Sequence, residues 1–222
     1  MRHSVGLRTV NVGLPAYLGT HRGRPVTSGI AKKPVTGTAE LWLSPTGLEG
    51  DGVADLVDHG GPDKAVYAYP SEHLPAWAAE LGDPTLLDPA LAPAPFGENL
   101  STAGWTEPDV CIGDRWRWGD AVLEVCQPRW PCFKLAIHRG RGDIGRLLKN
   151  AGRTGWYLRV LVAGAVPVAG PLTVIERHPA GVTVLAVHEA ARPGHAPREA
   201  IEELLTVGAL ADEWRGMLTA RL

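Results

Sequence analysis

Cysteine is scarce in this chain, and its spacing argues against several kinds of site. The 222 residues contain three cysteines, at positions 111, 126 and 132, and no Cys-x-x-Cys pair. This number and spacing disfavour a structural zinc knuckle, a thioredoxin-type redox pair and an iron–sulfur cluster held by four thiolates. Three unpaired cysteines are typical of the reducing cytoplasm, which is the location we expect.

Excess charge and long apolar runs are also missing. Lys and Arg total 22 against 24 Asp and Glu, so the net charge is −2 and no basic field attracts nucleic acid or an anionic membrane. No apolar run approaches the ~20 residues of a transmembrane helix. The segment Met1 to Gly6 lacks the apolar stretch of a signal peptide. We therefore expect no nucleic-acid partner and no membrane partner.

Dispersed glycine and proline predict many turns between short strands. The chain has 27 Gly and 19 Pro among 45% hydrophobic residues. Apolar periodicity predicts helices at 71–81 and 143–150, and strands at 4–12, 38–43, 64–69, 156–162 and 172–175. A β-hairpin is predicted from 114–118 to 121–126, turned by Gly119-Asp120, with Trp116 and Trp118 facing the core. These features favour a mainly β, α+β domain of barrel type over residues 1–178.

The chain changes character after residue 178. Thr183 is a candidate N-cap for a helix reaching Ala191, and Pro197 suits the first turn of a second helix. Trp214 and Leu218 belong to the apolar face of a third helix. Because helices this short are not stable alone, residues 183–222 are predicted to pack together as a small three-helix module.

The segment 127–135, Gln-Pro-Arg-Trp-Pro-Cys-Phe-Lys-Leu, is the strongest candidate for chemistry. Cys132 lies just beyond a predicted strand, with Arg129 and Lys134 nearby. A thiol acts as a nucleophile or metal ligand only as thiolate, and nearby cations lower its pKa. Pro128 and Pro131 restrict the backbone and predict a stiff loop. The alternative is a small buried hydrophobe, the usual fate of free cysteine, which we expect of the other two cysteines.

Other polar segments each have a structural and a functional interpretation. Residues 58–64 bring His59 and Lys64 around two adjacent glycines, which suits a phosphate-binding concavity or a plain turn. Lys33, with its neighbour Lys32, is either solvated or part of an anion site. Asn99 either contacts a ligand or caps a turn. His138 follows Cys132 by six residues and is a candidate base for it.

Several of these segments together resemble one family, the MOSC family (molybdenum cofactor sulfurase C-terminal domain). The closer likeness is to its bacterial branch linked to resistance against 6-N-hydroxylaminopurine, which carries a three-helix C-terminal extension. The segments that carry the resemblance are residues 59–66, 96–100, 113–115, 127–135 and 155–160. Departures from the branch are Trp130, Trp105 and Gly170-Pro171; Trp130 adjoins the cysteine segment and is expected to reshape the substrate pocket.

The resemblance implies a β-barrel that holds the molybdenum cofactor (molybdopterin). Cys132 would ligate molybdenum, a role that suits a soft thiolate. Lys33, His59, Lys64 and Asn99 would bind the pterin and its phosphate, with Arg129 and Lys134 supporting the thiolate. The implied reaction reduces N–OH to N–H in a small N-hydroxylated substrate such as a hydroxylated purine base.

The implied reductase needs a partner, because the chain has no flavin, haem or iron–sulfur motif. A separate reductase would supply electrons, and the three-helix module would either dock it or form a homodimer. Three other interpretations remain open. They are a non-catalytic cofactor or sulfur carrier that uses Cys132 as a persulfide, a Cys/His hydrolase that uses His138, and a nucleic-acid-binding barrel that uses Arg115 to Trp118.

Overall fold

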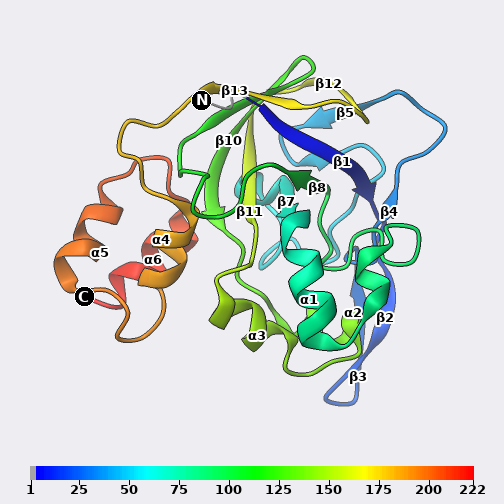
Figure 1. Ribbon diagram of the computed structural model, residues 1–222, viewed down its shortest axis with the longest axis horizontal. Helices are drawn as coiled ribbons and strands as arrows, with labels where there is room; N and C mark the ends of the chain where they lie inside the picture. The colour runs from blue at the N-terminus through cyan, green and yellow to red at the C-terminus, as the bar shows by residue number, and fades with distance from the viewer. Residues whose placement is uncertain (1–3) are drawn as a thin grey trace.

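The computed structural model describes residues 4–222, so Met1 to His3 of the N-terminal segment lie outside the described residues. Seven strands close into a barrel in the order β13-β9-β10-β11-β7-β8-β1, and β1 pairs back with β13 (Figure 1). All neighbours in this ring are antiparallel except β7 and β8. The ring strands are β1 (Ser4–Val12), β7 (Val66–Pro70), β8 (Leu100–Ala103), β9 (Arg115–Trp118), β10 (Ala121–Pro128), β11 (Trp156–Val162) and β13 (Leu172–Glu176).

The remaining elements surround this ring. The short strands are β2 (Ala16–His21), β3 (Arg24–Ser28), β4 (Lys33–Pro34), β5 (Glu40–Ser44), β6 (Gly47–Leu48) and β12 (Gly164–Pro167). The α-helices are α1 (Leu74–Leu81), α2 (Phe133–Arg139), α3 (Ile144–Ala151), α4 (Val184–Ala190), α5 (Arg198–Leu205) and α6 (Asp212–Thr219). Short 3₁₀ turns lie at η1 (Pro62–Lys64), η2 (Ser71–His73) and η3 (Pro84–Leu87).

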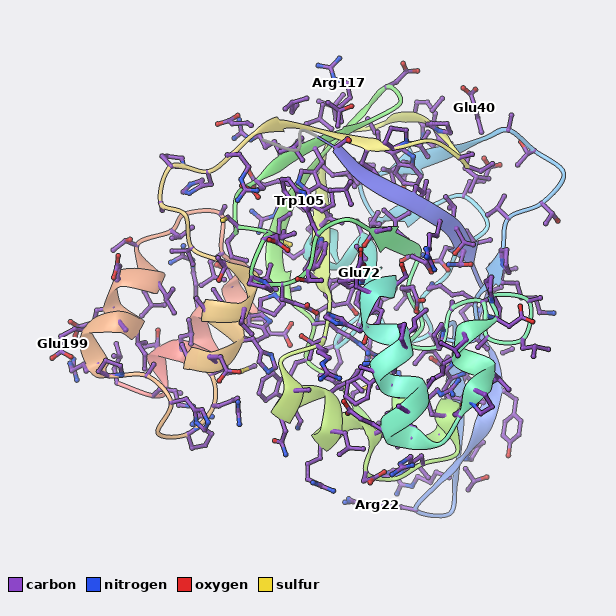
Figure 2. The ribbon with its side chains drawn as sticks, in the orientation of Figure 1. Arg22, Glu40, Glu72, Trp105, Arg117 and Glu199 are labelled. Carbon is purple, nitrogen blue, oxygen red and sulfur yellow. The ribbon has the colours of Figure 1, made fainter. Side chains whose placement is uncertain are left out.

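Tryptophan fills the barrel interior. Trp116, Trp118 and Trp156 are fully buried, and the rings of Trp116 and Trp156 meet edge to face with centroids 5.9 Å apart. Their inward position follows from the strand alternation, which leaves Arg117 exposed on the opposite face. Figure 2 shows Arg117 at the rim of the molecule. The predicted direction of the tryptophans in this hairpin is confirmed.

A second apolar cluster lies outside the barrel, under α1, α2 and α3 (Figure 1). It contains Tyr69, Trp77, Phe96, Leu135 and Leu148, all buried. The β2–β3 hairpin runs beside α2, where His21 stacks on Phe133 with ring centroids 4.4 Å apart. This cluster fixes the start of α2, and therefore the residue that precedes it, Cys132.

The three C-terminal helices pack on one side of the barrel (Figure 1). The Thr183 side chain accepts a hydrogen bond from the Ala186 N–H, so the predicted N-cap is confirmed. The barrel core continues without interruption into the module through Val187 and Trp214. The Ala211 N–H also donates to the carbonyl of Cys126 in β10, at 3.0 Å. The module therefore shares a core with the barrel, and its division from residues 1–178 stays a prediction.

Most predicted elements are present within a few residues of their predicted ends. The sequence patterns did not predict the β2–β3 hairpin, β4, β6, α2 or β12, nor the barrel strand β8, part of which was interpreted as a polar turn. Among residues 4–222, no helix combines the length and the apolar character that crossing a membrane requires.

Candidate functional site

Cys132 lies between the end of one strand and the start of one helix. Strand β10 ends at Pro128, helix α2 begins at Phe133, and Cys132 has extended backbone angles (φ −109°, ψ 175°). Its side chain is partly exposed, whereas Cys111 and Cys126 are buried. The predicted stiff loop is therefore present, and it brings one of the three thiols to the surface of a cavity.

A histidine and an aspartate line up behind this thiol. The Nε2 atom of His59 lies 3.2 Å from Cys132 Sγ, and its Nδ1 atom lies 3.1 Å from Asp55 Oδ2. Asp55 precedes His59 by four residues in a turn closed by the His59 N–H bonding the Asp55 carbonyl at 3.1 Å. The carboxylate thus fixes the orientation of the imidazole ring and favours a proton at Nδ1.

The electrostatics of this chain of contacts favour a thiolate–imidazolium pair. Burial alone would raise the pKa of the Cys132 thiol, but the hydrogen bond and charge of His59, the Lys134 backbone N–H and Arg129 together lower it to about 7. The hydrogen bond to Cys132 raises the pKa of His59. Backbone hydrogen bonding from Asp58, aided by His59 and Lys134, holds the pKa of Asp55 at about 2.

Two buried cations flank the pair. Lys134 Nζ lies 3.4 Å from Asp55 Oδ2 and 3.4 Å from His59 Nδ1. The Arg129 guanidinium is 6% exposed and stacks over the Tyr67 ring, 4.9 Å from its centroid. Within the described part of the chain, no carboxylate lies within 4.0 Å of the Arg129 guanidinium.

One cavity beside Cys132, which we call the inner cavity, is lined largely by residues 28–32, 52–59 and 96–97. It has a volume of about 110 Å³ and is lined by Lys32, Arg129 and Lys134 as well as by Asp55, His59 and Cys132. Glycines 29, 52 and 97 and the aromatic rings of Tyr67, Phe96 and Tyr157 complete its wall. Its three cations face one carboxylate, so the cavity is suited to an anion.

A second cavity, which we call the outer cavity, also borders the Cys132 thiol. It has a volume of about 490 Å³, and it shares His59, Trp130, Cys132 and Tyr157 with the inner cavity. Its far wall is formed by Glu213 and Trp214 of α6. Glu213 pairs with Lys64 of the barrel at 2.6 Å, which ties the module to the His59 segment. Cys132 therefore lies where two cavities meet.

Two protein-family models match this chain. The MOSC domain model matches residues 55–173, which is more than half of the chain and includes Asp55, His59 and Cys132. The chain belongs to the MOSC domain family. A second model, described as the YiiM-like 3-alpha helix domain, matches residues 182–222.

Relatives of this MOSC protein cover both parts of the chain. Protein YiiM of Escherichia coli is 42% identical over 90% of this chain and 85% of its own length. A protein of Gibberella moniliformis named Reductase is 38% identical over 77% of this chain and 29% of its own length. The crystal structure of YiiM from Geobacillus stearothermophilus superposes with a TM-score of 0.79 and 31% identity, covering 98% and 99% of the two chains.

The MOSC site gathers some of the predicted residues and separates others. His59, Arg129, Cys132 and Lys134 line the inner cavity together. Lys64 lines the outer cavity, where its ammonium also donates to the Asp58 carbonyl. The roles of these residues toward a cofactor stay predictions.

Lys33 and Asn99 lie elsewhere. Lys33 is exposed, pairs with Val12 through its backbone and lies outside both cavities. Lys32 and Lys33 are neighbours in an extended chain, so their side chains point in opposite directions. Lys32 takes the inward position and pairs with Asp51. Asn99 is buried, and its side chain hydrogen-bonds to the backbone and to Asp51. It accepts from the Tyr67 N–H at 3.0 Å and donates to Asp51 Oδ2 at 2.8 Å. It therefore orients the partner of Lys32.

The histidine beside Cys132 is His59, not His138. His138 lies on α2 and hydrogen-bonds the backbone of Ala94, so the hypothesis of a Cys132–His138 pair is wrong in its choice of histidine. Asp55 and Tyr157 were missed as site residues, and Lys32 was considered for an anion site only together with Lys33. The spacing of four between Asp55 and His59 is a signal that was present in the sequence. Among residues 4–222, no cluster of three or more His, Cys, Asp or Glu side chains could hold a metal ion.

Proposed function

We propose that this MOSC protein is a molybdenum-cofactor-dependent reductase of N-hydroxylated compounds. The reaction converts an N–OH group to N–H with two electrons and two protons, and releases water. The observation that carries the proposal is the position of Cys132, a thiol of low pKa between a cationic inner cavity and a roomier outer cavity. The relative named Reductase supports an oxidoreductase.

The residues of the inner cavity fit this cofactor chemically. The molybdenum cofactor is a pterin dithiolene with a terminal phosphate, and is therefore an anion. Arg129 is a buried cation without a carboxylate within 4.0 Å in the described chain, an arrangement that is costly unless an anion completes it. We propose that Arg129, Lys32 and Lys134 bind the anionic groups and that the Cys132 thiolate, a soft ligand, binds the metal. When bound, the cofactor would supply the redox and oxygen-transfer chemistry.

The chain itself would supply the proton that the departing hydroxyl needs. His59 lines both cavities, and the hydrogen bond to Cys132 raises the pKa of its imidazole. Asp55, held ionised by its low pKa, keeps that ring in place through Nδ1. A proton at Nε2 therefore lies at the border of the two cavities, where a hydroxyl leaving as water would take it up.

Metal analysis of paired cysteine variants tests this proposal. The wild type, Cys132→Ala and Cys126→Ala would be expressed in a host that makes the cofactor, and their molybdenum and pterin contents compared. Cys126 is the control because it is fully buried in β10 and lines neither cavity. We expect near-stoichiometric molybdenum in the wild type and in Cys126→Ala, and loss of molybdenum and of hydroxylamine reduction in Cys132→Ala. Full reductase activity in Cys132→Ala would refute the proposal.

The Asp55–His59–Cys132 alignment also favours a second candidate, a sulfur carrier. An activated thiolate can hold sulfur as a persulfide without any metal, and the same alignment is that of a Cys/His nucleophile. This candidate predicts cyanide-releasable sulfur on Cys132 and no turnover of hydroxylamines with any electron donor. The reductase predicts turnover once a separate reductase or a chemical donor supplies electrons.

A further inference from the structure

Basic residues are concentrated in two segments next to the cysteine loop. Residues 133–153, which include α2 and α3, contain six Lys or Arg residues and one acidic residue. Residues 16–28, which form the β2–β3 hairpin, contain two Arg residues and no acidic residue. Because the whole chain has a net charge of −2, these segments give one part of the molecule a charge of the opposite sign.

The fold brings the two segments together. Helix α2 packs against both α3 and β2, and these elements lie at the lower end of the view in Figure 1. Figure 2 shows Arg22 at the tip of the hairpin, at the end of the molecule opposite Arg117. Arg22, Arg24 and Arg146 are exposed, and Lys149 is partly exposed. These four cations form what we call the basic surface.

Ion pairs within the protein leave the basic surface largely uncompensated. Three other arginines of residues 133–153 are paired with carboxylates, namely Arg139 with Asp83, Arg141 with Asp143 and Arg153 with Glu80. Arg146 lies 3.8 Å from Asp143, with its side chain 65% exposed. Among residues 4–222, no carboxylate lies within 4.0 Å of Arg22, Arg24 or Lys149. The surface is therefore complementary to an acidic partner.

The basic surface adjoins the cysteine loop on two sides. The ring of His21, next to Arg22, stacks on Phe133 with centroids 4.4 Å apart. The Lys149 ammonium lies 5.0 Å from the ring centroid of Trp130. Phe133 follows Cys132 directly, Trp130 precedes it by two residues, and both rings line the outer cavity. A partner bound here would lie next to the Cys132 site.

Exposed apolar side chains lie in the same wall. Val57 is 92% exposed and Phe133 is 42% exposed, and both line the outer cavity. Leu56, the neighbour of Val57, is 75% exposed. Apolar side chains beside a charged rim are typical of a protein–protein interface. The combination favours a protein partner over nucleic acid, whose phosphates would use the cations but leave the aliphatic groups in water.

We propose that the basic surface and the apolar residues beside it bind the electron donor, and that this donor is a redox protein with an acidic face. The inference rests on the proposed function, which needs two electrons for each N–OH group. The N–O bond breaks, an N–H bond forms and the oxygen leaves as water. The donor loses the two electrons, and the two protons come from solvent.

The charge of the C-terminal module argues against docking of such a donor there. Residues 198–219, which include α5 and α6, contain five acidic residues and two Arg residues. An acidic partner would be repelled by this module and attracted by the basic surface. Of the two roles expected for the module, docking of the donor is therefore the one that the charges disfavour.

Binding of an acidic redox protein to matched variants tests the inference. The probe is oxidised flavodoxin, a small acidic flavoprotein, and its Kd for the purified full chain is measured by calorimetry. Arg22→Glu and Arg146→Glu are compared with Arg117→Glu, which reverses one exposed charge at the opposite end of the molecule (Figure 2). We expect the first two variants to weaken binding by about fivefold or more and Arg117→Glu to leave it unchanged. Added salt should weaken the binding of the wild type and remove the differences.

Turnover assays keep this inference distinct from the proposed function. Flavodoxin hydroquinone is compared with reduced benzyl viologen, a small donor that needs no docking surface. Each flavodoxin gives one electron as it becomes the semiquinone, so two are oxidised for each N–OH group reduced. We expect Arg22→Glu and Arg146→Glu to lower kcat/KM for flavodoxin by the factor seen in binding, and to keep the wild-type rate with viologen.

Each other outcome decides one of the two proposals. Flavodoxin binding without turnover by either donor would support the surface and count against the reductase. Turnover with viologen but not with flavodoxin, or equal losses in all three variants, would overturn the inference. Tighter binding of anionic lipid vesicles or of a single-stranded oligonucleotide than of flavodoxin would also overturn it, because the partner would then be a membrane or a nucleic acid. A dimer of this chain that Arg22→Glu dissociates would identify a second copy as the occupant instead.

Discussion

The ring of Trp130 meets the ring of Trp214 edge to face, with centroids 5.7 Å apart. Trp130 precedes the Pro131-Cys132 step, and Trp214 belongs to α6, so this contact joins the cysteine loop to the C-terminal module. The Lys149 ammonium lies 5.0 Å from the Trp130 ring centroid, and the His188 ring lies 5.5 Å away. Trp130 is therefore held between α3 and the C-terminal module.

A double-mutant cycle should measure this coupling. Trp130→Leu and Trp214→Leu are each expected to lower the free energy of unfolding by about 2–4 kcal/mol, because each removes a large packed ring. The aromatic pair itself should appear as a coupling of about 1 kcal/mol in the double variant. Urea unfolding of cofactor-free protein gives the three values. Trp105→Leu, paired with Trp214→Leu, is the control and should be additive, since Trp105 packs on Trp116 instead.

Alkylation should single out Cys132 among the three cysteines. Its lowered pKa of about 7 means that thiolate is present above pH 7 and is lost as the pH falls through 7. The rate of iodoacetamide labelling of cofactor-free protein should therefore be half-maximal near pH 7. Burial raises the pKa of both Cys111 and Cys126, so peptide mass spectrometry should find them unmodified at that pH.

The histidine variant shows whether the contact with His59 causes this behaviour. In His59→Ala, burial acts on the thiol without its principal hydrogen-bond partner, so the labelling midpoint should move toward the ordinary cysteine range of about 8.5. His138→Ala is the control, since His138 contacts Ala94 and lines neither cavity. A midpoint shared by wild type and His59→Ala would contradict the proposed thiolate–imidazolium pair.

The barrel was predictable because its signals are local. The alternation around Trp116 and Trp118, the Gly119-Asp120 turn and the Thr183 cap each act over a few residues, and the structure contains all three. The position of Cys132 in a loop was predictable for the same reason, since prolines on either side of Trp130 restrict the chain locally. Family resemblance then supplied the order in which these segments meet.

The site network was less predictable because it depends on long-range contacts. His59 and Cys132 are 73 positions apart, and only the folded barrel shows that His59 rather than His138 is adjacent. The choice between Lys32 and Lys33 turns on a one-residue register that composition does not fix. The partner of Glu213 is Lys64, on a distant segment of the chain, whereas Asp55 and His59 lie only four residues apart.

The two neighbouring lysines offer a matched pair of variants. Lys32 pairs with Asp51, both with 9% exposed side chains, and burial lowers the pKa of Lys32 despite that partner. Lys32→Ala would leave a buried carboxylate without its cation and should cost about 3–5 kcal/mol of unfolding free energy. Lys33→Ala should change stability by less than about 0.5 kcal/mol, because Lys33 is exposed. Equal losses in urea unfolding would contradict the inward assignment of Lys32.

Replacing Arg129 should keep or increase the stability of the cofactor-free protein but weaken cofactor binding. The Arg129 guanidinium is buried with no carboxylate within 4.0 Å among residues 4–222, and its anionic neighbour in the cofactor-free protein is the Cys132 thiolate; replacing such a buried charge pair by apolar side chains is often neutral or stabilising. Arg129→Met keeps the side chain's bulk and removes the charge, so cofactor-free protein should be as stable as the wild type or more stable, by up to about 2 kcal/mol. The same variant should lose most of its molybdenum when made in a cofactor-competent host.

Arg159→Met is the control, and we expect it to change stability and molybdenum content in the opposite way to Arg129→Met. Arg159 donates to Asp63 Oδ1 at 2.8 Å and to the largely buried Glu124 at 3.2 Å, and it lines neither cavity. Removing it leaves Asp63 without its cation and Glu124 with Arg115 alone, so unfolding free energy should fall by about 1–3 kcal/mol while the molybdenum content per folded protein is retained. If Arg129→Met instead destabilises the cofactor-free protein as much as Arg159→Met and keeps its molybdenum, Arg129 is structural. The cationic inner cavity would then lose its principal anion-binding group.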